Sequence, residues 1–295
     1  MVKKSGSKKK KINLKSPKKI IKKINLKSPK KTVKKIKLLN NKKSIDAKST
    51  KTIIKEKIST GIPELDKLIS GGFIAESINL VEGGSGSGKS ILAMQYLLEG
   101  LRKGESTMYV TFEEKKENFY KNMKKLGWDL EKEEKSKKFI FLEYSPEKIK
   151  MMLDEGGGAI ESLVLRNKVK RIVIDSITSF SLLYDNLLEK RGANIGFFDI
   201  IRKWKCTTLF TVQYDPSTTK KKDISLLEFE VDGIILLYFE KINNRRKRSL
   251  EIIKMRGTEH STDMHSFTIN HGIKINTTPQ KTISKKTKKS VKQNP

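Results

Sequence analysis

A glycine-rich segment is the part of the chain whose residue types and spacing point most directly to chemistry. Residues 83–90 read G-x-x-x-x-G-K-S, between an apolar stretch at 77–81 and a stretch with apolar residues at positions 91, 94, 98 and 101, which is helical spacing. Strand, glycine loop and helix in this order predict a P-loop, in which main-chain amides and a helix N-terminus surround phosphate oxygens. The loop residues are Gly83, Gly84, Ser85, Gly86, Ser87, Gly88, Lys89 and Ser90.

The end of this loop predicts how a nucleotide and a metal would be held. We expect Lys89 to reach the β- and γ-phosphates and the Ser90 hydroxyl to ligate Mg²⁺. A P-loop also needs a second magnesium anchor at the end of a buried strand, and RIVIDS at 171–176 supplies Asp175 there. An acid in this place could instead cap a following helix. With the P-loop present, the sequence predicts ATP and Mg²⁺ as cofactors.

Two adjacent carboxylates end another apolar stretch and are the candidates for activating water. MYVTFEE at 108–114 reads as a strand that ends in Glu113 and Glu114. Because successive strand residues face opposite ways, we expect only one of them to point at the γ-phosphate. The other would support the site, and the sequence does not say which is which. The predicted catalytic set is therefore Lys89 with Glu113 or Glu114.

The elements that must position these residues predict an α/β fold. The strands named above require a mostly parallel sheet with helices on both faces. VDGIILLYFEK at 231–241 and RSLEIIKM at 248–255 read as the strands of an antiparallel hairpin around a polar turn at 242–247. We expect this hairpin to extend the sheet at its C-terminal end.

The charge of the chain is concentrated in its two ends. Residues 1–51 hold 21 lysines and one acid, residues 276–295 hold six lysines and no acid, and 52–275 carries only +5 of the net +31. Isolated apolar residues among repelling lysines cannot form a core, so we predict two disordered basic tails around one domain at 52–275.

The N-terminal tail contains a repeat that suits an acidic partner. KINLKSPKKIIK at 11–22 is followed by KINLKSPKKTVK at 23–34, and each copy contains Ser-Pro-Lys-Lys. Proline fixes a compact turn from which two lysines project, and the motif resembles the SPKK repeats of histone tails. We predict nucleic-acid binding by 1–51 and 276–295; a solubilising tail is the plainer interpretation. Base-specific reading is not expected, because lysine contacts to phosphate carry no sequence information.

Composition excludes several protein classes. No apolar run approaches the roughly 18 residues of a membrane span, and the N-terminus lacks the apolar region of a secretory signal. The single Cys206 excludes a disulfide framework and is expected to be buried, and one Cys with three His makes a structural zinc site a poor fit. We therefore expect a cytoplasmic protein, associated with the nucleoid if the tails bind nucleic acid.

The motifs together resemble the KaiC-like branch of the RecA superfamily, over about residues 59–275. They are STGIPELDKLISGGF at 59–73, the P-loop, YVTFEE with KKLGWDL at 124–130, VDGIILLYFEK, and LEIIKMRGTEHSTDMHSFTINHGIKI at 250–275. The resemblance implies a RecA-like fold, slow ATP hydrolysis and a homo-oligomer, with a hexameric ring as the expected form. It adds Ile91 to the nucleotide-binding residues, places Lys125 near the base or ribose, and suggests Gln213 as a γ-phosphate sensor. One such domain, where clock members have two in tandem, does not support autokinase activity.

The same resemblance implies that part of the site comes from a neighbouring protomer. In this family a K-x-R-G segment reaches across a subunit interface to the γ-phosphate. Carried over to this sequence, the residues implied in trans are Lys254, Met255, Arg256, Thr258, His260 and, near a further family contact, Asn270. At Asn270 the chain reads INHG where the family reads I-T-D-H-G, so it is one residue short.

Three other interpretations fit parts of the sequence. A RadA- or RadB-like recombinase would use a DNA-binding loop at STTKKKDIS, residues 217–225. A DNA-tethered protein that binds ATP without turnover would not need both glutamates. A motility-type ATPase related to KaiC would have no evident use for the basic tails.

Overall fold

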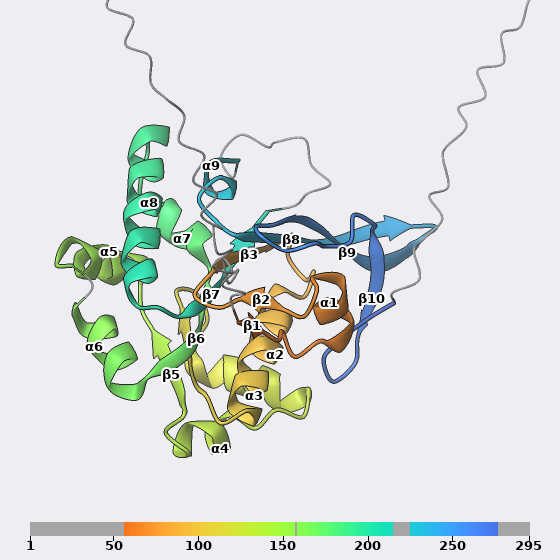
Figure 1. The fold of residues 1–295 in the computed structure, drawn as a ribbon, viewed down its shortest axis with the longest axis horizontal. Helices are drawn as coiled ribbons and strands as arrows, with labels where there is room; N and C mark the ends of the chain where they lie inside the picture. The colour runs from red at the N-terminus through yellow and green to blue at the C-terminus, as the bar shows by residue number, and fades with distance from the viewer. Residues whose placement is uncertain (1–55, 157, 215–224, 277–295) are drawn as a thin grey trace, which may run out of the picture. The chain divides into compact units, whose positions relative to one another are not determined.

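Figure 1 shows the computed structural model, which describes residues 56–156, 158–214 and 225–276. The lysine-rich segments 1–51 and 277–295 and the lysines at 220–222 lie outside the described residues. Predictions that concern those segments are therefore not addressed by the fold.

A nine-stranded sheet forms the centre of the described domain, in the order β11-β10-β9-β8-β3-β7-β6-β4-β5. Neighbouring strands from β8 to β5 are parallel, and β9, β10 and β11 add to the β8 edge in antiparallel fashion. The expected fold class, a mostly parallel sheet with an antiparallel C-terminal extension, is confirmed. The strands are β3 (Ile78–Gly83), β4 (Ser106–Thr111), β5 (Phe139–Glu143), β6 (Val169–Asp175), β7 (Thr207–Gln213), β8 (Gly233–Ile242), β9 (Arg245–Met255), β10 (His265–Ile269) and β11 (Ile273–Ile275).

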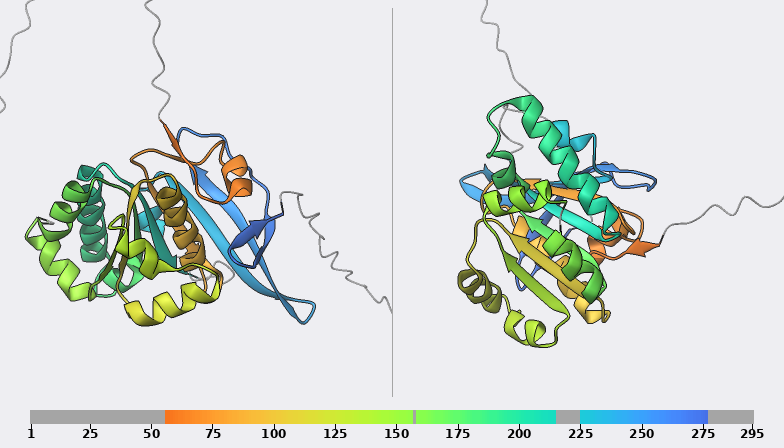
Figure 2. Two further views of the ribbon diagram at one scale, coloured as in Figure 1. Left: turned by 90° about the horizontal axis from the view of Figure 1, so that it is seen from below. Right: turned by 90° about the vertical axis from the view of Figure 1, so that its left-hand side faces the viewer.

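Helices cover both faces of this sheet (Figure 2). One apolar cluster joins the sheet to α1 (Pro63–Leu68), α2 (Lys89–Arg102), α3 (Lys116–Lys125) and α4 (Leu130–Lys135). A second cluster joins the opposite face to α5 (Pro146–Asp154), α6 (Gly158–Asn167), α7 (Ile177–Ser181), α8 (Leu187–Lys203) and α9 (Ser225–Glu228). Strands buried on both faces explain the near-continuous apolar runs seen in the sequence.

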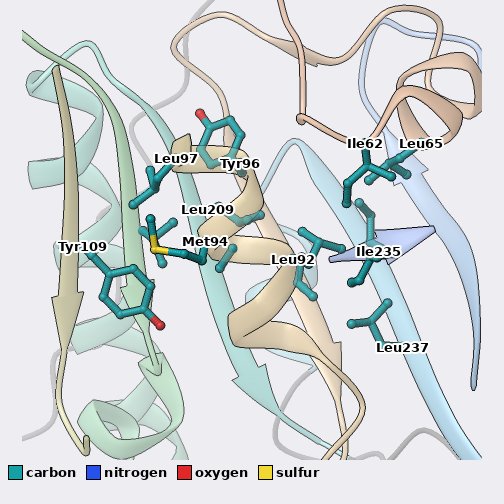
Figure 3. Close-up of a cluster of buried hydrophobic side chains, with 14 of the residues drawn as sticks. Ile62, Leu65, Leu92, Met94, Tyr96, Leu97, Tyr109, Leu209, Ile235 and Leu237 are labelled. Carbon is teal, nitrogen blue, oxygen red and sulfur yellow. The ribbon is translucent and has the colours of Figure 1, made fainter. Parts of the chain in front are cut away.

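The helix that follows the P-loop is held by the first of these cores (Figure 3). Its residues Leu92, Met94 and Leu97 are fully buried in the same cluster as Leu209 of β7 and Ile235 of β8. Each such side chain contributes about 1.5–3 kcal/mol by leaving water. The N-terminus of α2 is thereby fixed at the edge where the parallel strands end.

The predicted hairpin is confirmed, with a tighter turn than its polar composition suggested. β8 and β9 pair from Gly233 with Met255 to Ile242 with Arg245, so that only Asn243 and Asn244 form the turn. Both have positive φ, 48° and 61°. Two such residues are typical of the two-residue turns that match the twist of a hairpin.

An N-terminal ribbon that the sequence patterns did not predict lies beside the domain's first helix. β1 (Lys57–Ile58) pairs in antiparallel fashion with β2 (Phe73–Ile74). The side chain of Arg171 in β6, only 1% exposed, hydrogen-bonds the segment that follows β1 and so connects it to the sheet. Its Nη1 donates to the carbonyl oxygens of Ser59 (2.7 Å) and Tyr96 (2.9 Å), and its Nε donates to the Glu105 carboxylate.

In the ranges that the structure describes, no helix has the length and apolar character needed to span a lipid bilayer.

Candidate nucleotide site

The P-loop runs from the end of β3 to the start of α2, as its glycine spacing requires. Gly86 and Gly88 have φ of 74° and 110°, in the region that favours glycine over other residues. A side chain at Gly83 would lie 2.5 Å from Ser87 Oγ and 2.7 Å from the Leu237 carbonyl oxygen. The loop is therefore a tight backbone turn with no room for larger residues at its start.

Lys89 lies inside this turn. Its Nζ donates to the carbonyl oxygens of Gly83 (2.8 Å) and Gly84 (3.0 Å), and the residue is 9% exposed. Burial lowers the pKa of Lys89, and the negative charges of Asp175 and Glu113 partly oppose that effect. A cation held within hydrogen-bond reach of the loop's own carbonyls is placed to exchange them for phosphate oxygens.

The predicted magnesium anchors meet at the C-terminal edge of the sheet. Ser90 Oγ donates to Asp175 Oδ2 at 2.7 Å, although the two residues are 85 positions apart. The hydroxyl groups of Tyr109 and Thr211 also donate to the Asp175 carboxylate. Asp175 is thus fixed by side chains from α2, β4 and β7 rather than serving as a helix cap.

The two glutamates do not lie on the strand, and this corrects the expectation based on strand alternation. β4 ends at Thr111, whose Oγ1 accepts the main-chain N–H groups of Glu113 (3.3 Å) and Glu114 (3.1 Å). The threonine side chain therefore closes a turn that carries both carboxylates. Their different directions come from this turn and not from the pleat of the sheet.

Each glutamate has its own partners. Glu113 accepts hydrogen bonds from Ser176 Oγ (2.9 Å) and from Ser179, and Ser176 directly follows Asp175 in the chain. Glu114 accepts one from Asn122 Nδ2 of α3 at 3.1 Å. Burial raises the pKa of Glu114, the Asn122 bond opposes that effect, and the charge of Asp175 adds to it.

The sequence patterns did not predict several residues of this site. They are the side chains that hold the carboxylates in place: Tyr109, Thr211, Ser176, Ser179 and Asn122. Hydroxyl residues in or just after apolar strands that end at the P-loop edge would have been the available clue. Gln213 ends β7 at this same edge, and its main-chain N–H donates to Thr178 Oγ1 at 2.8 Å.

A magnesium nucleotide fits this arrangement of donors. A hydroxyl and a carboxylate converge at Ser90 and Asp175, which suits a hard divalent cation. Ser87 Oγ is buried in the loop without a hydrogen-bond partner among the described residues. Ile91, in the first turn of α2, packs partly against the core, so that its main chain is the part left for a ligand.

The segments that contain Lys125 and Asn270 both lie close to the P-loop helix α2 of the same chain. The turn after β10 that contains Asn270 is tied down by Ile273 N, which donates to Gln95 of α2 at 2.6 Å, and by His271 Nδ1, 3.2 Å from the Leu126 carbonyl oxygen. Lys125 directly precedes Leu126 at the end of α3. The turn that contains Asn270 therefore lies beside α2 and the end of α3 within the same chain.

The K-x-R-G residues lie at the end of the sheet where the parallel strands begin, opposite the end that carries the P-loop. Met255 pairs with Gly233, and Gly233 pairs with Asn79 near the start of β3, whereas the P-loop follows the end of β3. Lys254 Nζ donates to the Glu228 carbonyl oxygen at 2.8 Å, and Arg256 contacts Asp232. These two cations do not reach the P-loop of their own chain.

The remaining residues of that segment are engaged within the fold. The Met255 side chain is 9% exposed and belongs to the core, so that only its main chain is available to a ligand. Thr258 accepts a hydrogen bond from Lys57, and His260 Nδ1 lies 3.0 Å from the Ser261 carbonyl oxygen.

Comparison with known proteins shows the family of this chain. A family model described as "ATPase: KaiC" matches residues 58–281. A UPF0273 protein of Thermotoga maritima is 34% identical over 227 residues, which cover 72% of this chain and 93% of that protein. The circadian clock protein KaiC3 of Synechocystis is 33% identical over 72% of this chain, but the chain spans only 44% of its length.

A solved structure has the same fold. The crystal structure of a KaiC-like protein from Pyrococcus horikoshii OT3 matches with a TM-score of 0.66 and 31% sequence identity. The match covers 75% of this chain and 99% of that one. By the family model and by these relatives, this chain belongs to the KaiC-like ATPases of the RecA superfamily.

Proposed function

We propose that the protein hydrolyses ATP in a Mg²⁺-dependent reaction at the P-loop. The contact that carries this proposal is the 2.7 Å hydrogen bond from Ser90 to Asp175, with the buried Lys89 beside it. A hydroxyl and a carboxylate from two elements meet where a metal bound to nucleotide phosphates needs its protein ligands. Bound ATP would supply the phosphoryl group, and its Mg²⁺ would neutralise most of the negative charge on the phosphate oxygens.

Each residue has a proposed part in this reaction. The loop amides and Lys89 bind and orient the phosphates, and Ser90 with Asp175 holds the metal. Glu113 takes the proton from the attacking water, because its charge interacts with Lys89 and its carboxylate is fixed by two serine hydroxyls. Glu114, fixed to α3 through Asn122, positions the turn.

The arginine of the reaction would come from the next protomer. Four residue steps separate Asn79, at the Arg256 end of β3, from Gly83 at the P-loop end, which is about 13 Å of strand. Arg256 is half exposed, and its side chain contacts Asp232 and the Phe229 carbonyl oxygen, both in the segment just before β8. We therefore propose a ring, most simply a hexamer, in which Lys254 and Arg256 complete the neighbour's site.

The basic segments 1–51 and 276–295 would hold this ATPase domain, residues 52–275, on nucleic acid. Their charges of +20 and +6 flank a domain of only +5. Such charge supports sequence-independent binding to phosphate. A place on the nucleoid in the cytoplasm would follow from it.

The direct test is ATP turnover by the full chain as a function of Mg²⁺. Ser90→Ala should raise the Mg²⁺ concentration needed for half-maximal turnover, and Lys89→Ala should abolish turnover. Ser162→Ala, an exposed serine on α6 that is remote from the loop, is the matched control. Wild-type Mg²⁺ dependence in Ser90→Ala would refute the site assignment.

A further inference from the structure

A two-stranded ribbon at the end of the β8–β9 hairpin is not used by the proposed reaction. β3 pairs with β8 only as far as Leu237, and β10 pairs with β9 only as far as Arg248. Within the described parts of the chain, residues 238–247 therefore have no strand on either outer edge. Figure 2 shows the hairpin projecting past its neighbours.

This ribbon is strongly basic. Residues 240–248 contain five basic side chains and one acid, Glu240. The register pairs Lys241 with Arg246 and Phe239 with Arg248, so that three cations and no acid share one face. Arg245 and Lys247 add two cations to the other face. Residues 241–247 are exposed, and none of the five cations forms an ion pair with another described residue.

Two of the five cations, Arg246 and Arg248, are held in place in spite of the repulsion between like charges. The guanidinium groups of Arg246 and Arg248 lie 5.2 and 4.1 Å from the centre of the Phe239 ring, and Arg246 Nη1 donates to the Phe239 carbonyl oxygen at 2.8 Å. Like charges directly opposite each other, as at Lys241 and Arg246, destabilise a strand pair. An anionic partner would remove this repulsion, so the ribbon is better suited to a complex than to free solution.

We infer that the ribbon binds the sugar–phosphate backbone of duplex DNA. A small anion needs cations that converge on one point, whereas these cations are spread over both faces of a narrow ribbon. The DNA major groove accepts a two-stranded β-ribbon, and phosphates line both of its walls. This surface belongs to the domain itself, separate from the tails, and it does not depend on whether ATP is turned over.

The ribbon is also joined to the P-loop. Arg248 donates to the Gly86 carbonyl oxygen through Nη2 (3.0 Å) and Nε (3.2 Å). A side chain at Gly86 would lie 3.4 Å from the Phe239 ring. Arg248 and Phe239 thus connect the base of the ribbon to the P-loop.

The test compares two full-length variants that lose the same charge. One carries Arg245→Gln, Arg246→Gln and Lys247→Gln at the ribbon. The control carries Lys121→Gln, Lys132→Gln and Lys135→Gln, which are exposed lysines around α3 and α4. Affinity for a fluorescent 20-base-pair DNA duplex is measured by anisotropy as a function of salt, and assembly by size-exclusion chromatography.

The slope of log affinity against log salt should become shallower by about 2.7 in the ribbon variant, at about 0.9 per phosphate contact, and stay unchanged in the control. A variant with Arg245→Lys and Arg246→Lys keeps the charge and should keep the slope, which assigns the effect to charge rather than to side-chain shape. Equal slopes in wild type and the ribbon variant overturn the inference, as does an equal loss in the control. Loss of assembly with unchanged DNA binding also overturns it and assigns the ribbon to another copy of the chain.

Discussion

Glu82 lies in the strand directly before the P-loop, and its charge should control how stability depends on pH. It is 0% exposed, and neither carboxylate oxygen has a hydrogen-bond partner among the described residues. Its strand neighbours are Val212 and Leu236. Burial, with a smaller contribution from the charge of Glu228, raises the pKa of Glu82 to about 8. The carboxyl is therefore neutral at pH 7 in the folded protein.

The sign and size of the effect follow from the two pKa values. The unfolded chain releases this proton near its ordinary pKa of 4.5 and the folded chain near 8, so the folded state holds the proton more tightly. The contribution of Glu82 to the free energy of unfolding should therefore be largest below pH 4.5 and be lost as pH rises through 8. The full difference is about 5 kcal/mol, of which about 3 kcal/mol falls between pH 5 and pH 8.

Glu82→Gln removes the ionisation and keeps the size of the side chain. Urea unfolding of the full chain, followed by the fluorescence of its two tryptophans, gives the free energy of unfolding at each pH. The variant should match wild type near pH 5 and exceed it by about 3 kcal/mol near pH 8. Glu117→Gln, at an exposed carboxyl on α3, is the control and should run parallel to wild type. Parallel curves for Glu82→Gln and wild type would show that the buried carboxyl is solvated or paired.

Three further predictions concern the site, the core and the tails. Glu113→Gln should bind ATP normally and lose at least 100-fold in turnover, whereas Glu114→Gln should retain most of its turnover. Equal rates of phosphate release in the two variants would reject this assignment. Arg171→Ala should lower the free energy of unfolding by about 3–5 kcal/mol because Glu105 and two carbonyl oxygens lose their partner, and a change under 1 kcal/mol in urea unfolding would contradict this. Removing residues 1–50 should leave turnover intact and make the salt dependence of duplex binding much shallower; an unchanged salt slope would assign binding to the domain alone.

Local patterns were sufficient to predict the P-loop, Asp175 and the β8–β9 hairpin. Each of these depends on residues close together in sequence, such as the glycine spacing before Lys89 or an acid at the end of an apolar strand. The burial of Cys206, 2% exposed, was predicted from its strand in the same way. Parallel order then follows, because strands that alternate with helices end at one edge of the sheet.

Contacts between distant segments could not be predicted from those patterns. The bond between Arg171 and Ser59 joins residues 112 positions apart, and nothing in either local sequence indicates it. The directions of Glu113 and Glu114 depend on how the Thr111 hydroxyl ends β4, which the apolar run conceals. The position of Asn270 beside its own P-loop helix depends on Gln95, a polar residue within an apolar helical pattern.

The central claim is that ATP is hydrolysed between two protomers, with the P-loop from one and Arg256 from the other. The most direct test mixes two inactive full-length variants, Lys89→Ala and Arg256→Ala, in equal amounts and measures phosphate release. Random assembly places an intact loop against an intact arginine at about a quarter of the interfaces, so about a quarter of wild-type activity should return. Lys89→Ala mixed with Asp175→Asn should recover none, because both defects lie on the P-loop side. No recovery in the first mixture, with co-assembly shown by cross-linking, would contradict the account and make Arg256 a structural residue at the end of its strand.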